Sequence, residues 1–365
     1  MTAAFARPTA GAAPIIAVDA NGADLGPAEV AAGAALAAHQ GAHVLLFGPA
    51  AEFGFGPATE LGTLPDNVEV VDAPVSIAKA PDPARAVRST PEASIVQAAR
   101  AVASGRADAL VCAGSTGAAL AAGLFNIKRA PGIYRPALAI PVPVPRHPVT
   151  LLDVGANAEA RREHLVQFAF MGAALAHTVL GVRRPRIGLL SNGEEDARGS
   201  ALVVQTRAEL AERMIDEPAL EFVGNVEGTD VVRGVADVIV TDGLTGNIAL
   251  KLMEGVSQTM LESVRDAAMS SRRSKLGGAL LRPALRTFRD ELDPEAHGGA
   301  YLLGLRSLGV VPHGRFSRSG FAQAILRAQR GVEQDVVGRT HAALDAAGAL
   351  KSAPVSASGA SLRPS

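Results

Sequence analysis

Short apolar runs that each end in a cluster of glycine with Asn, Asp, Ser or Glu recur along this chain. Runs such as 15–18, 109–112 and 149–152 lack polar alternation, which is typical of strands buried on both faces of a parallel sheet. In open α/β sheets, the loops at the carboxyl ends of such strands build the ligand site. We therefore expect one crevice lined by six polar clusters, at 19–24, 113–117, 153–157, 191–195, 224–228 and 242–247.

Alanine- and leucine-rich helical patterns separate the strand-like runs, so the chain is predicted to consist of repeated βα units. A helix over 163–180 is marked by an acidic first turn and by Gly181 after its last apolar residue. We expect a single α/β/α catalytic domain over 14–345, between a flexible leader at 1–13 and a disordered tail at 351–365. Prolines alternate in 140–145, which predicts an extended edge strand or connector.

The composition excludes several classes of protein. The net charge of −1 argues against nucleic-acid binding, and no stretch approaches the ~18 apolar residues of a membrane-spanning helix. Cys112 is the only cysteine, so no internal disulfide or cysteine metal cluster can form, and a cytoplasmic setting is the simplest inference. The 8 histidines have no zinc-binding spacing, and no metal site is predicted.

The segment 257–292 is predicted to be a basic amphipathic helical hairpin. Its cations include Arg272, Arg273 and Lys275, and they are interleaved with apolar residues such as Leu276 and Leu280. This pattern fits an anionic membrane surface or an acidic protein partner. A solvated helix face beside a dimer interface explains the same residues equally well.

The glycine-rich turn 114–117 lies between an apparent strand and a helix, where backbone N–H groups and hydroxyls can bind phosphate. No GxGxxG follows the first strand, and neither a P-loop nor a GxSxG nucleophile turn occurs. If the chain handles an activated acyl group, the nucleophile can be a substrate such as inorganic phosphate. The protein then has only to position that phosphate and stabilise the developing oxyanion.

Nine motifs, in this order between about residue 14 and residue 340, together resemble the bacterial phosphate acyltransferases of the PlsX family. They are VDANGADLGP at 18–27, AGSTGA at 113–118, RPALA at 135–139, LLDVGAN at 151–157, EHLVQFA at 163–169, GEE at 193–195, GNVEG at 224–228, DGLTGN at 242–247 and GGAYLLG at 298–304. Each motif alone is weak, but the ordered set is highly specific. The chain departs from the usual family pattern at Asn21, Ala23, Ser115, Arg315 and Phe316, and the last two put a role for His313 and Gly314 in question.

The resemblance implies transfer of a fatty acyl group from acyl-[acyl carrier protein] to inorganic phosphate, giving acyl phosphate for phospholipid synthesis. It also implies a three-layer α/β/α fold with a mostly parallel sheet, related to the isocitrate and isopropylmalate dehydrogenases and to phosphotransacetylase. The family is typically homodimeric and peripherally membrane-associated, with no cofactor. A glycerol-3-phosphate acyltransferase is a further possible partner.

Within this resemblance we expect phosphate and the thioester to be bound by residues of the polar clusters and by one cation. They are Gly114, Ser115, Thr116, Gly117, Arg135, Asn157, Asn192, Gly193, Asn225, Gly246 and Asn247. The candidate catalytic residues are His164, Lys251 and Asp242. Any one of these asparagines can equally be a turn or capping residue.

Three other functions fit parts of the sequence. An acyl-CoA-dependent phosphate acyltransferase would differ only in the thioester donor. A metal- and NAD-dependent dehydrogenase of the related fold would need clustered aspartate ligands. A non-catalytic scaffold would bind the carrier protein without releasing thiol.

Overall fold

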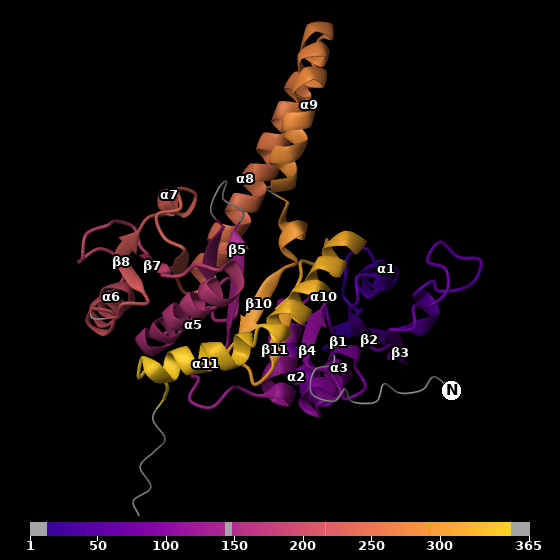
Figure 1. Ribbon diagram of the computed structural model, residues 1–365, viewed down its shortest axis with the longest axis horizontal. Helices are drawn as coiled ribbons and strands as arrows, with labels where there is room; N and C mark the ends of the chain where they lie inside the picture. Colours follow the sequence, from indigo (N-terminus) through magenta and orange to yellow (C-terminus); the bar gives the residue numbers. More distant parts are fainter. Residues whose placement is uncertain (1–12, 143–147, 216, 292, 352–365) are drawn as a thin grey trace, which may run out of the picture.

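The computed structural model describes residues 13–142, 148–215, 217–291 and 293–351. The leader predicted at 1–13 and the tail predicted at 351–365 therefore lie outside the described residues, apart from Ala13 and Lys351. Most of the described chain forms one twisted sheet with helices on both faces (Figure 1).

The sheet has eleven strands in the order β3-β2-β1-β4-β11-β10-β5-β6-β9-β7-β8. Their bounds are β1 Ile15–Asp19, β2 His43–Gly48, β3 Val68–Asp72, β4 Ala109–Cys112, β5 Ala137–Val142, β6 Val149–Leu152, β7 Arg186–Leu190, β8 Glu221–Val226, β9 Val238–Val240, β10 Ala300–Leu303 and β11 Leu308–Val311. Nearly every residue of the inner strands is buried, as the unbroken apolar runs predict.

The two halves of the sheet run in opposite directions. Strands β3, β2, β1, β4 and β11 are mutually parallel, and so are β6, β9, β7 and β8. Three antiparallel pairings, β11–β10, β10–β5 and β5–β6, join the halves and reverse the direction. We call the edge at the carboxyl ends of β1, β4 and β11 the first edge, and the edge at the carboxyl ends of β6, β7, β8 and β9 the second edge.

Helices cover both faces, so the predicted three-layer α/β/α fold is confirmed. The buried apolar residues of α1, α5, α10 and α11 pack on one face, and those of α3 and α4 pack on the other. The helix bounds are α1 Pro27–His39, α2 Pro83–Ser89, α3 Ser94–Ala103, α4 Thr116–Ala122, α5 Arg162–Leu180, α6 Ala201–Arg213, α7 Gly228–Val231, α8 Gly243–Met269, α9 Arg272–Glu291, α10 Arg318–Glu333 and α11 Val336–Ala346. Short helical turns lie at Ala50–Glu52, Gly123–Ile127 and Pro294–His297.

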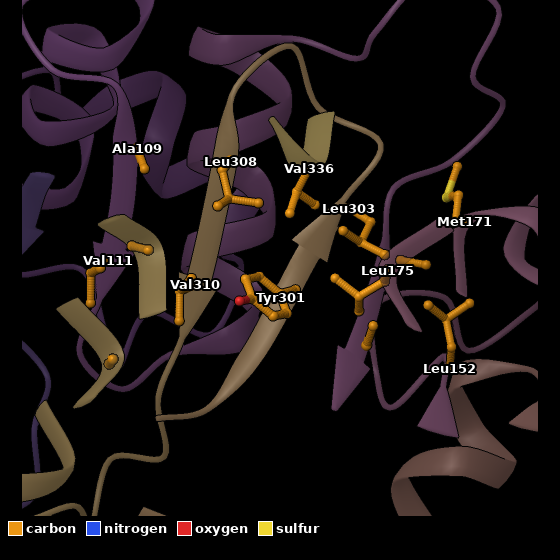
Figure 2. Packing of buried hydrophobic residues seen from close by; sticks show 14 of the residues in the cluster. Ala109, Val111, Leu152, Met171, Leu175, Tyr301, Leu303, Leu308, Val310 and Val336 are labelled. Atoms are coloured by element: carbon orange, nitrogen blue, oxygen red, sulfur yellow. The ribbon is translucent and has the colours of Figure 1, made fainter. Parts of the chain in front are cut away.

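Tyr301 of β10 lies in the core where the two halves of the sheet join (Figure 2). Its ring is 1% exposed, and its neighbours in the core include Leu303, Leu308 and Val310. The Arg327 guanidinium lies 4.5 Å from the centre of that ring. Burying side chains of this size stabilises the fold by roughly 1.5–3 kcal/mol each, so the junction between the halves is part of one continuous core.

The sequence predicts an edge strand or connector over 140–145; for 140–142 the edge-strand prediction is wrong, while residues 143–145 lie outside the described residues. Pro141 lies in β5, which is a central strand paired with β10 on one side and β6 on the other. The pairing with β10 covers only Ala137–Ala139, and Pro141 pairs with Thr150 of β6 alone. The pairing with β10 does not reach Pro141. The missing proline N–H therefore leaves no carbonyl group of β10 without a donor.

The helical hairpin is confirmed as a projecting element, but its first helix is longer than predicted. Helix α8 begins at Gly243, directly after β9, and α9 returns beside it (Figure 1). Leu250 and Met253 of α8 pack on the sheet, and the rest of the hairpin extends beyond it. Among the described residues, no helix combines the length and the apolar character needed to cross a membrane.

Helix α5 has the predicted ends. It runs from Arg162 to Leu180, with Glu163 in its first turn. Gly181 follows with a φ of 70°, a left-handed conformation that glycine adopts without steric cost.

Candidate functional site

The polar clusters do not converge on one crevice, and that prediction is wrong. The clusters 19–24 and 113–117 follow β1 and β4 and lie at the first edge. The clusters 153–157, 191–195, 224–228 and 242–247 follow strands of the other half and lie at the second edge. The antiparallel strands between the halves cause this separation.

At the first edge, the loops after β1 and β4 meet at a topological switch point. The chain passes from β1 to β2 on one side and returns to β4 on the other side, which is where α/β sheets place their ligands. Gly114 has a φ of 120°, and a Cβ there would lie 2.2 Å from the carbonyl oxygen of Gly22. Only glycine permits this close contact between the two backbones.

The turn 114–117 leads directly into α4. Ser115 is the N-cap of this helix, and its Oγ accepts a hydrogen bond from Ala118 N at 3.2 Å. The Ser115 hydroxyl can still donate its own proton. Within the described residues the Thr116 hydroxyl has no hydrogen-bond partner, so it is a second available donor beside Gly117.

A buried polar network lies beneath these two loops. The Asp19 carboxylate is 2% exposed and accepts hydrogen bonds from Ser94 Oγ at 2.6 Å, Asn21 N at 3.3 Å and Cys112 Sγ at 3.7 Å. Burial raises the pKa of Asp19 to about 7, although these hydrogen bonds act in the opposite direction. A narrow recess, too tight to hold a water molecule, lies between this network and Ser115.

A third loop, after β11, joins the first edge. Asp24 N donates to the carbonyl oxygen of Gly314 at 2.8 Å, which holds this loop against the loop after β1. The neighbouring His313 lies within electrostatic reach of Lys251 and Glu254, which α8 carries across the sheet from the second edge. The structure therefore brings Lys251 to the same edge as the turn 114–117, as the predicted phosphate site needs.

At the second edge, N–H groups of the cluster 153–157 donate hydrogen bonds to the carboxylate of Asp153, which belongs to the same cluster. Asp153 is 0% exposed, and its carboxylate accepts five hydrogen bonds. The donors are Leu138 N, Gly155 N, Ala156 N, Asn157 N and Asn157 Nδ2, at 2.8–3.1 Å. The backbone amides that could bind a phosphate here are therefore already occupied by a fixed anion.

Other polar residues of the second edge also bind the protein itself. Asn157 Nδ2 donates to Pro136 O as well as to Asp153, and Asn225 Nδ2 donates to Glu195 O. Asp242 is the N-cap of α8 and accepts from both the backbone N and the hydroxyl of Thr245. These contacts account for Asn157 and Asp242 without a ligand, whereas Asn225 Oδ1 is buried with no hydrogen-bond partner among the described residues. The ligand or catalytic roles of all three residues stay predictions.

Two glycines of the second edge lie in close contact with neighbouring groups. A Cβ at Gly246 would lie 1.9 Å from Asp153 O, and one at Gly193 would lie 2.8 Å from Arg198 Cγ. Asn192 is exposed, and Asn247 lies against the backbone of Gly155. A larger residue at Gly193 or Gly246 would therefore collide with its neighbours, which explains these glycines by packing.

His164 and Arg135 belong to the second edge as well. His164 is 7% exposed, and its Nδ1 accepts a hydrogen bond from Arg161 N at 3.2 Å at the start of α5. Burial lowers the pKa of His164, Glu163 raises it, and the exposed Arg135 guanidinium is one of two cations that lower it further. These two residues therefore lie at the opposite edge of the sheet from the turn 114–117.

The hairpin exposes both of its predicted features. Arg272, Arg273 and Lys275 are exposed, and Leu276 and Leu280 are 67% and 77% exposed. Helix α8 adds a row of exposed apolar residues spaced four apart, which winds around the helix along its length because four residues exceed one turn: Leu244, Ile248, Leu252, Val256, Met260 and Val264. No group of three or more His, Cys, Asp or Glu side chains that could share a metal ion occurs within the described ranges.

Sequence reasoning missed Glu254 and the placement of His313 beside Asp24 at the first edge. Only the order of the strands shows that the loops after β1 and β11 are neighbours, because β11 is the last strand in the sequence and pairs with β4. Motifs also do not predict that α8 starts at the second edge and places Lys251 at the first.

The chain matches the family described as "Fatty acid synthesis protein" over residues 15–339. It is 41% identical over 325 residues to a phosphate acyltransferase of Geobacillus sp. (strain WCH70), which covers 88% of this chain and 96% of that relative. A phosphate acyltransferase of Bacillus cytotoxicus is 39% identical over the same shares.

Solved structures similar to this chain share its fold. A phosphotransacetylase from Streptococcus pyogenes has a TM-score of 0.59 at 19% identity, over 88% of this chain and 94% of that one. A phosphotransacetylase from Staphylococcus aureus, EutD, has a TM-score of 0.55 at 17% identity, over 87% and 94% of the two chains.

Proposed function

The chain belongs to the PlsX family of phosphate acyltransferases, and from that membership we propose that it transfers a fatty acyl group from an acyl carrier protein to inorganic phosphate. The phosphate is the direct nucleophile, and it binds at the first edge. The observation that carries this proposal is the meeting there of three glycine-containing loops with Lys251.

The first edge has the groups that a phosphate needs. The hydroxyls of Ser115 and Thr116 and the ammonium of Lys251 supply donors and positive charge, while the buried Asp19 lies beneath the loops. Because the pKa of Asp19 is raised to about 7, much of this carboxyl is neutral at pH 7 and repels a phosphate less than an ordinary carboxylate would.

The reaction needs no nucleophilic side chain. An oxygen of monohydrogen phosphate attacks the acyl carbon, the carbon–sulfur bond breaks, and the proton of the phosphate ends on the leaving thiolate. A thiol pKa of about 8.5 makes that thiolate a good leaving group. The loops contribute by holding the phosphate in attack geometry and by stabilising the oxyanion that forms.

The hairpin supports a carrier protein as the donor. Acidic carrier proteins would be attracted to the exposed cations Arg272, Arg273 and Lys275, and such attraction acts mainly on the rate of encounter. The exposed apolar row of α8 passes the first edge on its way toward these cations and can cover an acyl chain. Peripheral membrane contact and a homodimer, both implied by the family, would use the same exposed row.

The decisive experiment measures thiol release from long-chain acyl-[acyl carrier protein], with and without inorganic phosphate, in metal-free buffer. We expect release that depends on phosphate, with acyl phosphate formed in equal amount. Release without phosphate would instead indicate a thioesterase. Comparison with the matching acyl-CoA separates the two donors, since a CoA-dependent enzyme would prefer the smaller thioester.

The docking role of the hairpin is tested by the variant Arg272→Glu/Arg273→Glu/Lys275→Glu. We expect the KM for the acyl carrier donor to rise about tenfold, because the attraction becomes a repulsion. The KM for phosphate should not change. The matched control reverses three exposed cations on other elements, Arg100, Arg183 and Arg330, and an equal effect there would rule out a specific docking surface.

A further inference from the structure

The loop after β11 holds one imidazole in a fixed orientation at the first edge. Gly314, next to His313, accepts a hydrogen bond from Asp24 N at 2.8 Å. A Cβ at Gly314 would lie only 3.3 Å from Asp24 Oδ1, so the two loops are closely packed. The position of His313 is therefore set by the loop after β1 as well as by its own strand.

Two groups of the same loop hold the ring, the backbone N–H of Arg315 and the side chain of Phe316. Arg315 N donates a hydrogen bond to His313 Nδ1 at 3.2 Å. The Phe316 ring stacks on the imidazole, with the ring centres 6.4 Å apart and the planes 28° from parallel. Because Nδ1 accepts a hydrogen bond, the proton of the neutral ring is on Nε2.

The surroundings of His313 also disfavour the imidazolium. The ring is half-buried, and this burial is the largest cause of its lowered pKa. Glu254 of α8 and Asp24 raise the pKa, whereas Arg315 and Lys251 lower it. A second proton would have to occupy Nδ1, which would then lose its hydrogen bond from Arg315 N.

We propose that His313 is a neutral, fixed hydrogen-bond donor whose Nε2–H binds an oxygen of the phosphate beside Lys251. This inference rests on the proposed function and names one further ligand of its nucleophile. His313 neither gains nor loses a proton during acyl transfer, because the proton of the phosphate passes to the thiolate. Its contribution is to bind and orient the attacking phosphate, as a preorganised donor does.

Two substitutions separate the donor from the shape of the ring. His313→Phe keeps an aromatic ring against Phe316 but removes the N–H donor. His313→Gln keeps an N–H close to the position of Nε2 and gives up the ring. We expect the phosphate KM to rise about 30-fold in the Phe variant, with the acyl donor KM unchanged, and to rise no more than about threefold in the Gln variant.

Two further readouts distinguish binding from folding and from proton transfer. At a phosphate concentration near the wild-type KM, phosphate should raise the melting temperature of the wild type and of His313→Gln, and that of His313→Phe hardly at all. The pH–rate profiles of the wild type and of His313→Gln should have the same shape around pH 6.5, the ordinary pKa of histidine. The profile to be excluded is a loss of rate near that pH in the wild type that is absent from His313→Gln. Such a loss would mean that the ring ionises during catalysis, and the proposal would be wrong.

The outcomes also separate this inference from the proposed function. If the wild type releases thiol in a phosphate-dependent way and His313→Phe has the same phosphate KM, only the role of His313 is refuted. If the wild type shows neither phosphate-dependent release nor stabilisation by phosphate, the proposed function fails and this inference fails with it.

Discussion

The two edges of the sheet carry the same kind of polar cluster but use it differently. At the second edge, Asp153 and Asp242 are hydrogen-bonded to their own loops and caps. At the first edge, the loops pack on one another through Gly22 and Gly114 and stand beside Lys251, which comes from the opposite edge. A cluster of Gly, Asn and Asp at a strand end is therefore ambiguous until the partners of its polar atoms are known.

The largest expected effect is on the stability of the second edge. Asp153→Ala removes the acceptor of five hydrogen bonds and leaves the buried N–H groups of Leu138 and Asn157 without it. We expect the free energy of unfolding to fall by about 4 kcal/mol, since each buried unsatisfied donor costs about 1–3 kcal/mol. Urea denaturation measures this change.

The aspartate that caps α8 is the control for this substitution. Asp242→Ala removes an acceptor at a half-exposed helix start, where a lost N-cap costs about 1 kcal/mol. If Asp153→Ala costs no more than Asp242→Ala, the second-edge cluster is not held by its own carboxylate, and its amides would be open to a ligand.

The next effect is the pH dependence caused by Asp19, the buried aspartate of the first edge. Burial raises its pKa to about 7 from an ordinary value of 3.8, so the folded state holds this proton while the unfolded chain has lost it. Stability therefore falls as the pH rises from about 4 to about 7, by about 4 kcal/mol in total, and the loss is complete above that range.

Asp19→Asn should remove this penalty because its amide oxygen still accepts from Ser94 Oγ and carries no charge. We expect the melting temperature of the variant to exceed that of the wild type at pH 8 and to match it near pH 4.5. An equal difference at both pH values would show that Asp19 ionises normally in the folded protein. Asp153→Asn provides the contrast, because its new N–H group would face N–H donors and destabilise at both pH values.

The third prediction decides between the two edges as the phosphate site. Lys251→Met should raise the phosphate KM about 30-fold, since it removes the cation that α8 brings to the first edge. Arg135→Met, which removes the exposed cation of the second edge, should change it less than about threefold. Steady-state kinetics with varied phosphate measures both values, and the reverse order would move the site to the second edge.

The layers of the fold could be predicted from the sequence because they depend on local patterns. Unbroken apolar runs such as 15–18 predict buried strands, and Gly181 marks the end of α5. The direction of each strand could not be predicted in this way, because it depends on pairings between distant segments such as β4 and β11. That missing information is why the sequence placed Asn157 and Ser115 in one crevice.

The interpretation of single residues has the same limit. Pro141 suggested an edge strand because a proline cannot pair on both sides, yet it lies beyond the end of β10 in a central strand. His313 seemed doubtful because its neighbours depart from the family pattern, yet the backbone N–H of Arg315 and the ring of Phe316 orient its imidazole. For Pro141 the deciding fact is where a strand distant in the sequence, β10, stops pairing. For His313 it is the contact that two adjacent residues make with the ring.

The smallest expected effects come from two threonines in the first turns of α4 and α8, one at each edge. Thr245 stands near the start of α8 and donates its hydroxyl to Asp242 Oδ2 at 2.7 Å, whereas Thr116 begins α4 with no such partner among the described residues. Valine has the same shape without the hydroxyl. Thr245→Val should lower the free energy of unfolding by about 1 kcal/mol and leave the phosphate KM unchanged.

Thr116→Val should do the opposite. Its hydroxyl supports no other part of the fold, so stability should stay within about 0.5 kcal/mol of the wild type. The phosphate KM should rise about tenfold, because a hydrogen bond to a charged oxygen is lost. Chemical denaturation and steady-state kinetics on the same two variants test this crossed pattern. If both variants lose stability and neither changes the phosphate KM, both hydroxyls have a structural role. The difference between a ligand-binding first edge and a structural second edge would then not hold for these two threonines.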